Sequence, residues 1–175
     1  MDRMIVGGVS AQDWQLWREF VTMHRHLARE LDRRLQRDAG ISQADFSVLA
    51  ALADSRDERL RTGELAELLA WEKSRVSHQV SRMEARGLVD RTECETDGRG
   101  TWVGITAEGH RVLREATTDH GSAIRSLFLD HLRDDDKGVV GAVARRVLDQ
   151  LSPEACEIAA DAGMSGVPRT TAPAA

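Results

Sequence analysis

The chain has 175 residues and a formal net charge of −5, with 41% hydrophobic and 30% charged residues. This length is typical of one domain that buries its core without disulfides or a structural metal. Apolar runs stay far below the roughly 20 residues that span a bilayer, and the N-terminal apolar patch is too short for a signal peptide. We therefore expect a cytoplasmic protein without membrane contacts. Its acidic balance offers no general attraction for a polyanion.

Residues 11–38 are predicted to form one long amphipathic helix. Apolar side chains recur along this segment at spacings of three and four, the period of an α-helix. Ser10 is placed to cap its beginning, and Gly40 to end it. A second helix is predicted after Ser42, where Asp45 follows three residues on and completes a capping pattern.

A charged stretch then leads into two short helices and a hairpin. Gly87 ends the second helix, and turn-forming residues join the two strands. We predict a helix over 63–70 capped by Thr62, a helix over 72–86, and strands over 88–95 and 101–105.

The rest of the chain is predicted to be helical up to residue 163. Thr106 caps a long helix over 107–132, and three consecutive aspartates suit the positive end of a helix that runs to Leu151. Ser152 and Pro153 then begin a short final helix. Residues 164–175 are rich in Pro, Ala, Thr and Gly, and we predict that they are disordered.

The predicted helix over 72–86 has two different faces. Val76, Val80 and Met83 share an inward side, whereas the other side is basic and polar. Residues 73–91 hold five basic and two acidic side chains in an otherwise acidic chain. Arginine can donate two hydrogen bonds to guanine, and glutamine can pair with adenine. Phosphate contacts are expected from Lys73, Arg86 and Arg91. The candidate DNA-binding residues are Lys73, Ser74, Arg75, Ser77, His78, Gln79, Arg82, Arg86 and Arg91.

Two of these interpretations have a plainer alternative. A basic helix face can be a solvated surface laced with salt bridges, but the short helix before it and the hairpin after it favour DNA reading. The hairpin tip from Asp97 to Gly100 can be a simple turn. Arg99 there also suits a narrow minor groove, and Asp97 can hold a neighbouring arginine.

Several motifs in this order resemble the multiple antibiotic resistance regulator (MarR) family. The resemblance covers about residues 15–150, with Ile105 in place of the usual leucine and Trp71-Glu72-Lys73 in place of a small capping residue. The motifs are Gly63–Leu69, Ser74–Ser77, Arg82–Glu84, Gly87–Val89, Asp97-x-Arg99 and Ile105–Gly109.

The resemblance implies a mainly α fold that contains a winged helix-turn-helix with a two-stranded β-wing. N- and C-terminal helices flank this domain, and they are expected to join two chains into a homodimer. It also implies that Ser74, Arg75, Ser77, His78 and Arg82 face the major groove, that Arg99 enters the minor groove and that Asp97 orients the wing. The implied regions are a flexible N-terminus (1–10), a helical dimerisation region (11–40 and 107–163), the winged helix-turn-helix DNA-binding domain (41–106) and the tail (164–175).

We therefore expect a sequence-specific transcriptional regulator. It is expected to be a repressor that binds double-stranded DNA at a pseudo-palindromic operator. Members of the family are often released by small molecules, frequently aromatic acids. Trp17, Phe20, His24 and Phe46 are the candidate ligand pocket, because aromatic walls and one titratable group suit a phenolic carboxylate. The alternative is a packed dimer core with a satisfied histidine, and the same alternative applies to His120.

Other classes of function find less support in these residues. We find no catalytic nucleophile with its base, no phosphate-binding loop and no metal-ligand spacing, so no enzymatic activity, metal or cofactor is predicted. Redox sensing is a second alternative, but Glu93 and Glu95 beside Cys94 oppose thiolate formation, and Cys156 has no evident activating partner. A third alternative is a winged-helix module that binds another protein. Such a module needs an apolar or acidic face on the helix over 72–86, where this chain has arginines.

Overall fold

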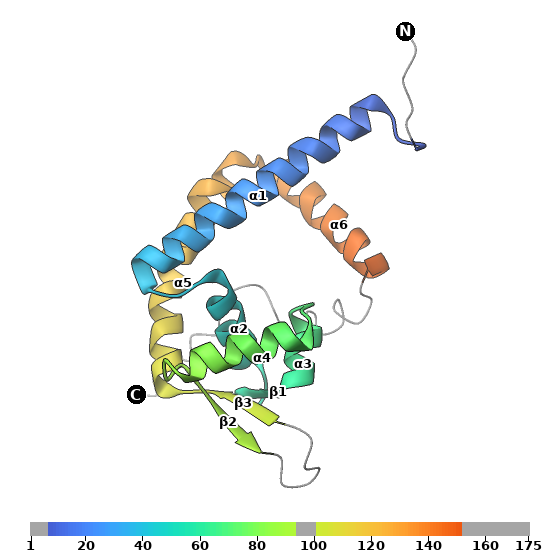
Figure 1. The fold of residues 1–175 in the computed structure, drawn as a ribbon. Helices are drawn as coiled ribbons and strands as arrows, with labels where there is room; N and C mark the ends of the chain where they lie inside the picture. Colours follow the sequence, from blue (N-terminus) through green and yellow to red (C-terminus); the bar gives the residue numbers. More distant parts are fainter. Residues whose placement is uncertain (1–6, 94–100, 152–175) are drawn as a thin grey trace.

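The computed structural model describes residues 7–93 and 101–151 (Figure 1). Its elements, in chain order, are α1 (Ala11–Ala39), α2 (Gln43–Asp54), β1 (Arg59–Arg61), α3 (Thr62–Leu68), α4 (Lys73–Glu84), β2 (Val89–Glu93), β3 (Thr101–Ile105), α5 (Ala107–Leu127), the 3-10 turn η1 (Leu129–His131) and α6 (Asp134–Leu151).

The elements form two parts joined by α5. In Figure 1, α2, α3, α4 and the small sheet lie together at the bottom, and α5 rises from the sheet to pack against the long helix α1. The N-terminal half of α1 extends away from this lower part, and α6 slopes from beside α1 toward the right of the view. The mainly helical fold with a winged helix-turn-helix between terminal helices is confirmed. None of the described helices is long and apolar enough to cross a membrane.

Most predicted helix ends are confirmed, because local hydrogen bonds determine them. The Ser10 hydroxyl oxygen accepts from the Asp13 backbone N–H (3.1 Å), and the α1 helix ends at Gly40 in the left-handed conformation (φ 65°). At the start of α2, Ser42 and Asp45 each accept from the other's backbone N–H, at 2.8 and 3.1 Å. Such reciprocal bonds satisfy donors that the first turn of a helix leaves free.

Three of the predicted helices differ from the structure in their ends, and the one predicted over 72–86 spans Lys73–Glu84. Arg61, not Thr62, occupies the cap position of α3, and its backbone N–H donates to the Glu64 carboxylate (2.8 Å). The Thr62 hydroxyl instead donates to the Thr101 carbonyl (3.2 Å) and so ties α3 to the sheet. The helix predicted over 107–132 ends at Leu127, and η1 follows it. The predicted helix after Ser152 and the predicted tail lie outside the described residues.

The sheet has three strands in the order β1-β3-β2, not the predicted two. Strand β1 pairs antiparallel with β3, with Arg61 opposite Trp102. A strand of three residues with a single apolar side chain carries too little alternation to be recognised by its pattern. Both Arg59 and Arg61 hold their guanidinium groups 5.2 Å from the centre of the Trp102 ring, which supports the pairing.

One hydrophobic core joins the helix-turn-helix to the long helices. Leu49 and Leu52 of α2, Leu65 of α3 and Val103 of β3 are fully buried together with the inward face of α4. The core continues through α5 to the C-terminal end of α1 at Leu35. The position of α4 is therefore determined by packing on several elements at once.

Candidate DNA-binding interface

Helix α4 presents one buried and one exposed face. Val76, Val80 and Met83 are at most 1% exposed and pack against the core. On the other side, the structure places a group of polar and basic side chains in solvent, as the sequence predicted: Lys73, Ser74, Arg75, Ser77, His78 and Arg82. Their contact with DNA stays a prediction.

Gln79 does not belong to the exposed face, and this part of the prediction is wrong. Only 3% of Gln79 is exposed to solvent. Gln79 lies three residues after Val76 and four before Met83, so helix periodicity turns it inward with them. Its amide donates from Nε2 to the Asp45 carboxylate (2.6 Å), and its Oε1 accepts from Arg82 Nη2.

Asp45 is a buried carboxylate that the DNA-binding prediction did not include. Beyond its bonds to Ser42 and Gln79, it accepts from Arg86 Nη1 at 2.9 Å. A buried charge must be paired and hydrogen-bonded to be tolerated, and these contacts supply both. Its capping position was visible in the sequence, but its partners Gln79 on α4 and Arg86 just after α4 lie 34 and 41 residues away. No local pattern could have revealed them.

Arg86 and Arg91 form hydrogen bonds that link separate elements of the domain. Arg86 donates to Asp45 and to the Gly40 carbonyl (2.8 Å), which joins the end of α4 to the turn after α1. Arg91 on β2 donates to the Ser77 carbonyl (3.0 Å) and the Ser81 hydroxyl (2.8 Å). The structure therefore gives both predicted phosphate contacts a structural role, and a phosphate must compete with these partners.

Asp97 and Arg99 at the predicted wing tip lie outside the described residues, as do Cys94 and Cys156. The minor-groove contact of Arg99 and the wing orientation by Asp97 stay predictions, and redox sensing by a cysteine stays an untested alternative. The strands that lead into the tip, β2 and β3, are described and pair from Val89 opposite Ile105 to Glu93 opposite Thr101.

Three of the four residues of the predicted ligand pocket are exposed side chains of α1, and the fourth is a buried side chain of α2. Trp17 and Phe20 stack with ring centres 6.1 Å apart, but they are 56% and 53% exposed. His24 is exposed too. Phe46 is buried and packs against His120 of α5, with ring centres 4.6 Å apart. A ligand pocket formed by these four residues stays a prediction.

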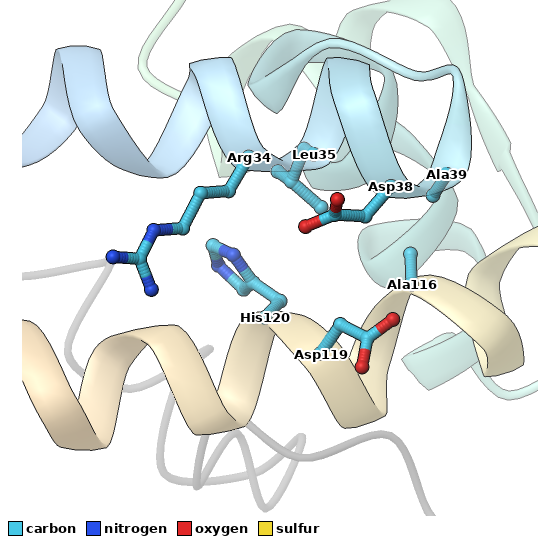
Figure 2. A pocket seen from close by; sticks show the side chains of 7 residues that line it. All are labelled: Arg34, Leu35, Asp38, Ala39, Ala116, Asp119 and His120. Carbon is cyan, nitrogen blue, oxygen red and sulfur yellow. The ribbon is translucent and has the colours of Figure 1, made fainter.

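A small cavity does lie beside His120, between α1 and α5 (Figure 2). It has room for about one water-sized molecule (about 10 Å³). The imidazole of His120 points from α5 toward α1, and Arg34 and Asp38 line the opposite wall. His120 is 8% exposed, and its Nδ1 has no hydrogen-bond partner within the described residues. In the single chain that the structure describes, His120 is thus buried with one ring nitrogen unpartnered, and the alternative of a packed dimer core with a satisfied histidine stays a prediction.

Comparison with known proteins is consistent with this geometry. A model of the MarR family matches residues 39–100. Sco3205, a MarR family transcriptional regulator from Streptomyces coelicolor solved in complex with DNA, is 35% identical, with a TM-score of 0.80 over 88% of this chain and 94% of that one. AbsC, a MarR family regulator from the same organism, is 29% identical, with a TM-score of 0.78 over 87% of this chain and all of the other.

A more distant relative is the transcriptional repressor MprA of Escherichia coli (strain K12). It is 24% identical over 112 residues, which are 64% of this chain and 63% of MprA. The match therefore spans less than two thirds of MprA. The order of the elements and the exposed basic face of α4 agree with the similarity to Sco3205, which extends along most of both chains. We conclude that this protein belongs to the MarR family of transcriptional regulators.

Proposed function

We propose that this protein is a transcriptional repressor that binds a pseudo-palindromic operator as a homodimer. The main observation behind this proposal is the exposed basic face of α4. The opposite face of the helix is fully buried in the core, so the basic side chains are fixed on the surface. In this proposal Arg75 and Arg82 read base edges in the major groove, and Lys73 contacts a phosphate. Sco3205, which is solved in complex with DNA, supports the proposal that this chain binds DNA.

Exposed apolar side chains on the terminal helices support the dimer. Leu16, Trp17 and Phe20 on α1 are 53–66% exposed, and Leu151 on α6 is 74% exposed. Soluble monomers rarely leave large contiguous apolar patches in water. The residue ranges predicted for dimerisation (11–40 and 107–163) and for DNA binding (41–106) are part of this proposal. A two-fold interface would place two copies of α4 on successive turns of the duplex.

The first test is selection of genomic fragments by the purified protein, followed by sequencing. We expect a two-fold symmetric motif with half-sites about one helical turn apart. Unpatterned, salt-sensitive binding would contradict sequence-specific reading and leave α4 as a general electrostatic surface. Absence of DNA binding would favour a winged-helix module that binds protein.

A single variant then tests the assignment of α4. Arg82→Ala is expected to weaken binding to the selected operator by about 1–3 kcal/mol, because a bidentate contact with guanine is worth that much. Binding to random duplex of the same length should change little. An equal loss on both DNAs would make Arg82 a phosphate contact instead.

We also propose that a small aromatic acid releases the protein from DNA by binding beside His120. The observations that support this site are the unpartnered His120 Nδ1 and the Arg34 side chain on the opposite wall. A carboxylate there can accept from Arg34 and His120, while Phe46 supplies an aromatic surface behind the imidazole. Because the cavity is small, the ligand must separate α1 from α5, and such a movement can alter the spacing of the two α4 helices.

Salicylate is a suitable probe of the effector site. We expect it to dissociate the protein from operator DNA in a fluorescence anisotropy titration, and we expect Arg34→Ala to abolish the effect. Arg33 is the matched control, since it pairs with the same Glu30 carboxylate but does not line the cavity. Equal release of both variants, or no release of the wild type by salicylate, would contradict this site.

A further inference from the structure

Gln79 links a buried carboxylate to an arginine on the exposed face of α4. It is 3% exposed, as is Asp45, and its side-chain amide bonds to Asp45 at one end and to Arg82 at the other. Arg82 itself is exposed. The buried face of α4 is therefore connected to its exposed face through one amide group.

The orientation of that amide follows from the chemistry of its neighbours. Asp45 accepts hydrogen bonds from Ser42, from Arg86 and from Gln79, and an ionised carboxylate can only accept. The NH₂ of Gln79 must therefore face Asp45. Its carbonyl oxygen is consequently directed outward, where it accepts from Arg82. The position of Asp45 is itself fixed by the capping box at the start of α2.

This contact restricts a side chain that is otherwise free to adopt many rotamers. An arginine loses rotamer freedom when it is ordered, and a binding site that orders it beforehand loses less free energy on binding. Gln79 engages a single N–H of the Arg82 guanidinium, which leaves other donors of its planar fork available. A fork held in one orientation favours a bidentate partner over a diffuse phosphate contact.

We propose that Gln79 is a positioning residue for base recognition: held by Asp45, it orients Arg82 without touching DNA. The inference rests on the proposed function, in which α4 enters the major groove. Under this proposal, Gln79 contributes to specificity, the ratio of the affinity for the operator to the affinity for other DNA. It contributes little to the affinity for DNA of random sequence.

A double-mutant cycle between Gln79 and Arg82 tests the proposal. Gln79→Met keeps the length of the side chain and removes both hydrogen bonds. We expect it to lower affinity for the selected operator by about three- to tenfold, with affinity for random duplex unchanged. In the Arg82→Ala background, Gln79→Met should cause no further loss. Thermal unfolding of each variant establishes that it is folded, and Gln79→Leu replaces Gln79→Met if the latter does not fold.

Arg75 provides the matched control. It lies on the same exposed face, but its guanidinium contacts Trp71 and not Gln79, so the losses caused by Arg75→Ala and Gln79→Met should multiply. A loss of the same size with and without Arg82, or a parallel loss on random DNA, would overturn the positioning role while leaving the proposed function intact. If Arg82→Ala itself changes neither affinity, the proposed reading by α4 fails, and the inference fails with it.

Discussion

Arg75 lies over the indole ring of Trp71, with its guanidinium carbon 4.1 Å from the ring centre. Trp71 occupies the turn between α3 and α4 and packs partly against the hydrophobic core. The adjacent residue Glu72 takes the cap position of α4 without a side-chain hydrogen bond. The unusual residues at this turn thus supply an aromatic support for an arginine rather than a helix cap.

We predict that Trp71→Leu weakens binding to the selected operator by roughly 0.5–1 kcal/mol, the size of an exposed cation–π contact. Leucine fills part of the same apolar space but offers no π-face to Arg75. Trp71→Phe is the control, because it keeps a ring and should retain most of the affinity in anisotropy titrations. Equal losses for the two variants would show that packing of the turn, and not the ring face, is responsible.

Self-association is predicted to depend on the apolar face of α6. Val147 is 48% exposed, and an aspartate at this position would bury a charge in the proposed interface. Val147→Asp should therefore shift the sedimentation equilibrium toward monomer. Gly138→Asp introduces the same charge at an exposed position on the opposite side of the same helix, where a Cβ would meet no atom within 4 Å in the described structure, and it should leave the dimer in place. If Val147→Asp sediments as the wild type does, α6 does not take part in the interface.

Stability is predicted to fall in mild acid because of His120. Burial lowers the pKa of this imidazole below its ordinary value of 6.5. Below about pH 6.5 the unfolded chain binds a proton that the folded chain binds less readily, so the free energy of unfolding falls as the pH falls. The charged groups beside His120 are Arg34 and Asp38 on α1 and Asp119 on α5.

Urea unfolding at about pH 7.5 and about pH 5.5 measures this effect. We expect the wild type to lose more stability between the two values than His120→Leu does. Above about pH 7.5 the difference in unfolding free energy between the two proteins should be constant, because the imidazole is neutral in both states there. The same pH dependence in both proteins would exclude His120 as its source.

Two glycines of α5 are predicted to respond in opposite directions to alanine. A Cβ atom on Gly109 would lie 2.2 Å from the Leu88 carbonyl oxygen, so Gly109→Ala should destabilise the fold by about 1–3 kcal/mol. A Cβ on Gly121 would meet no atom within 4 Å in the described structure, so Gly121→Ala should stabilise the helix by about 0.5–1 kcal/mol. Thermal unfolding compares the two variants, and a loss for Gly121→Ala would show that a second chain packs there.

Sequence alone determined the features that arise from residues a few positions apart. The cap of α1 by Ser10, the capping box of α2 and the left-handed end at Gly40 depend on backbone groups within one turn. The division of α4 into a buried and an exposed face likewise follows from its period. The same period places Gln79 among the apolar residues, although glutamine suggested the opposite face by its chemistry.

Tertiary structure alone decided which distant groups meet. Strand β1 exists because β3 supplies its hydrogen-bonding partner, and Phe46 faces His120 because α2 packs against α5. The contacts of Asp45 with Gln79 and Arg86 also depend on how α2 lies against α4. A carboxylate's charge and its capping position are local properties, but which donors reach it in the interior depends on packing of the whole core.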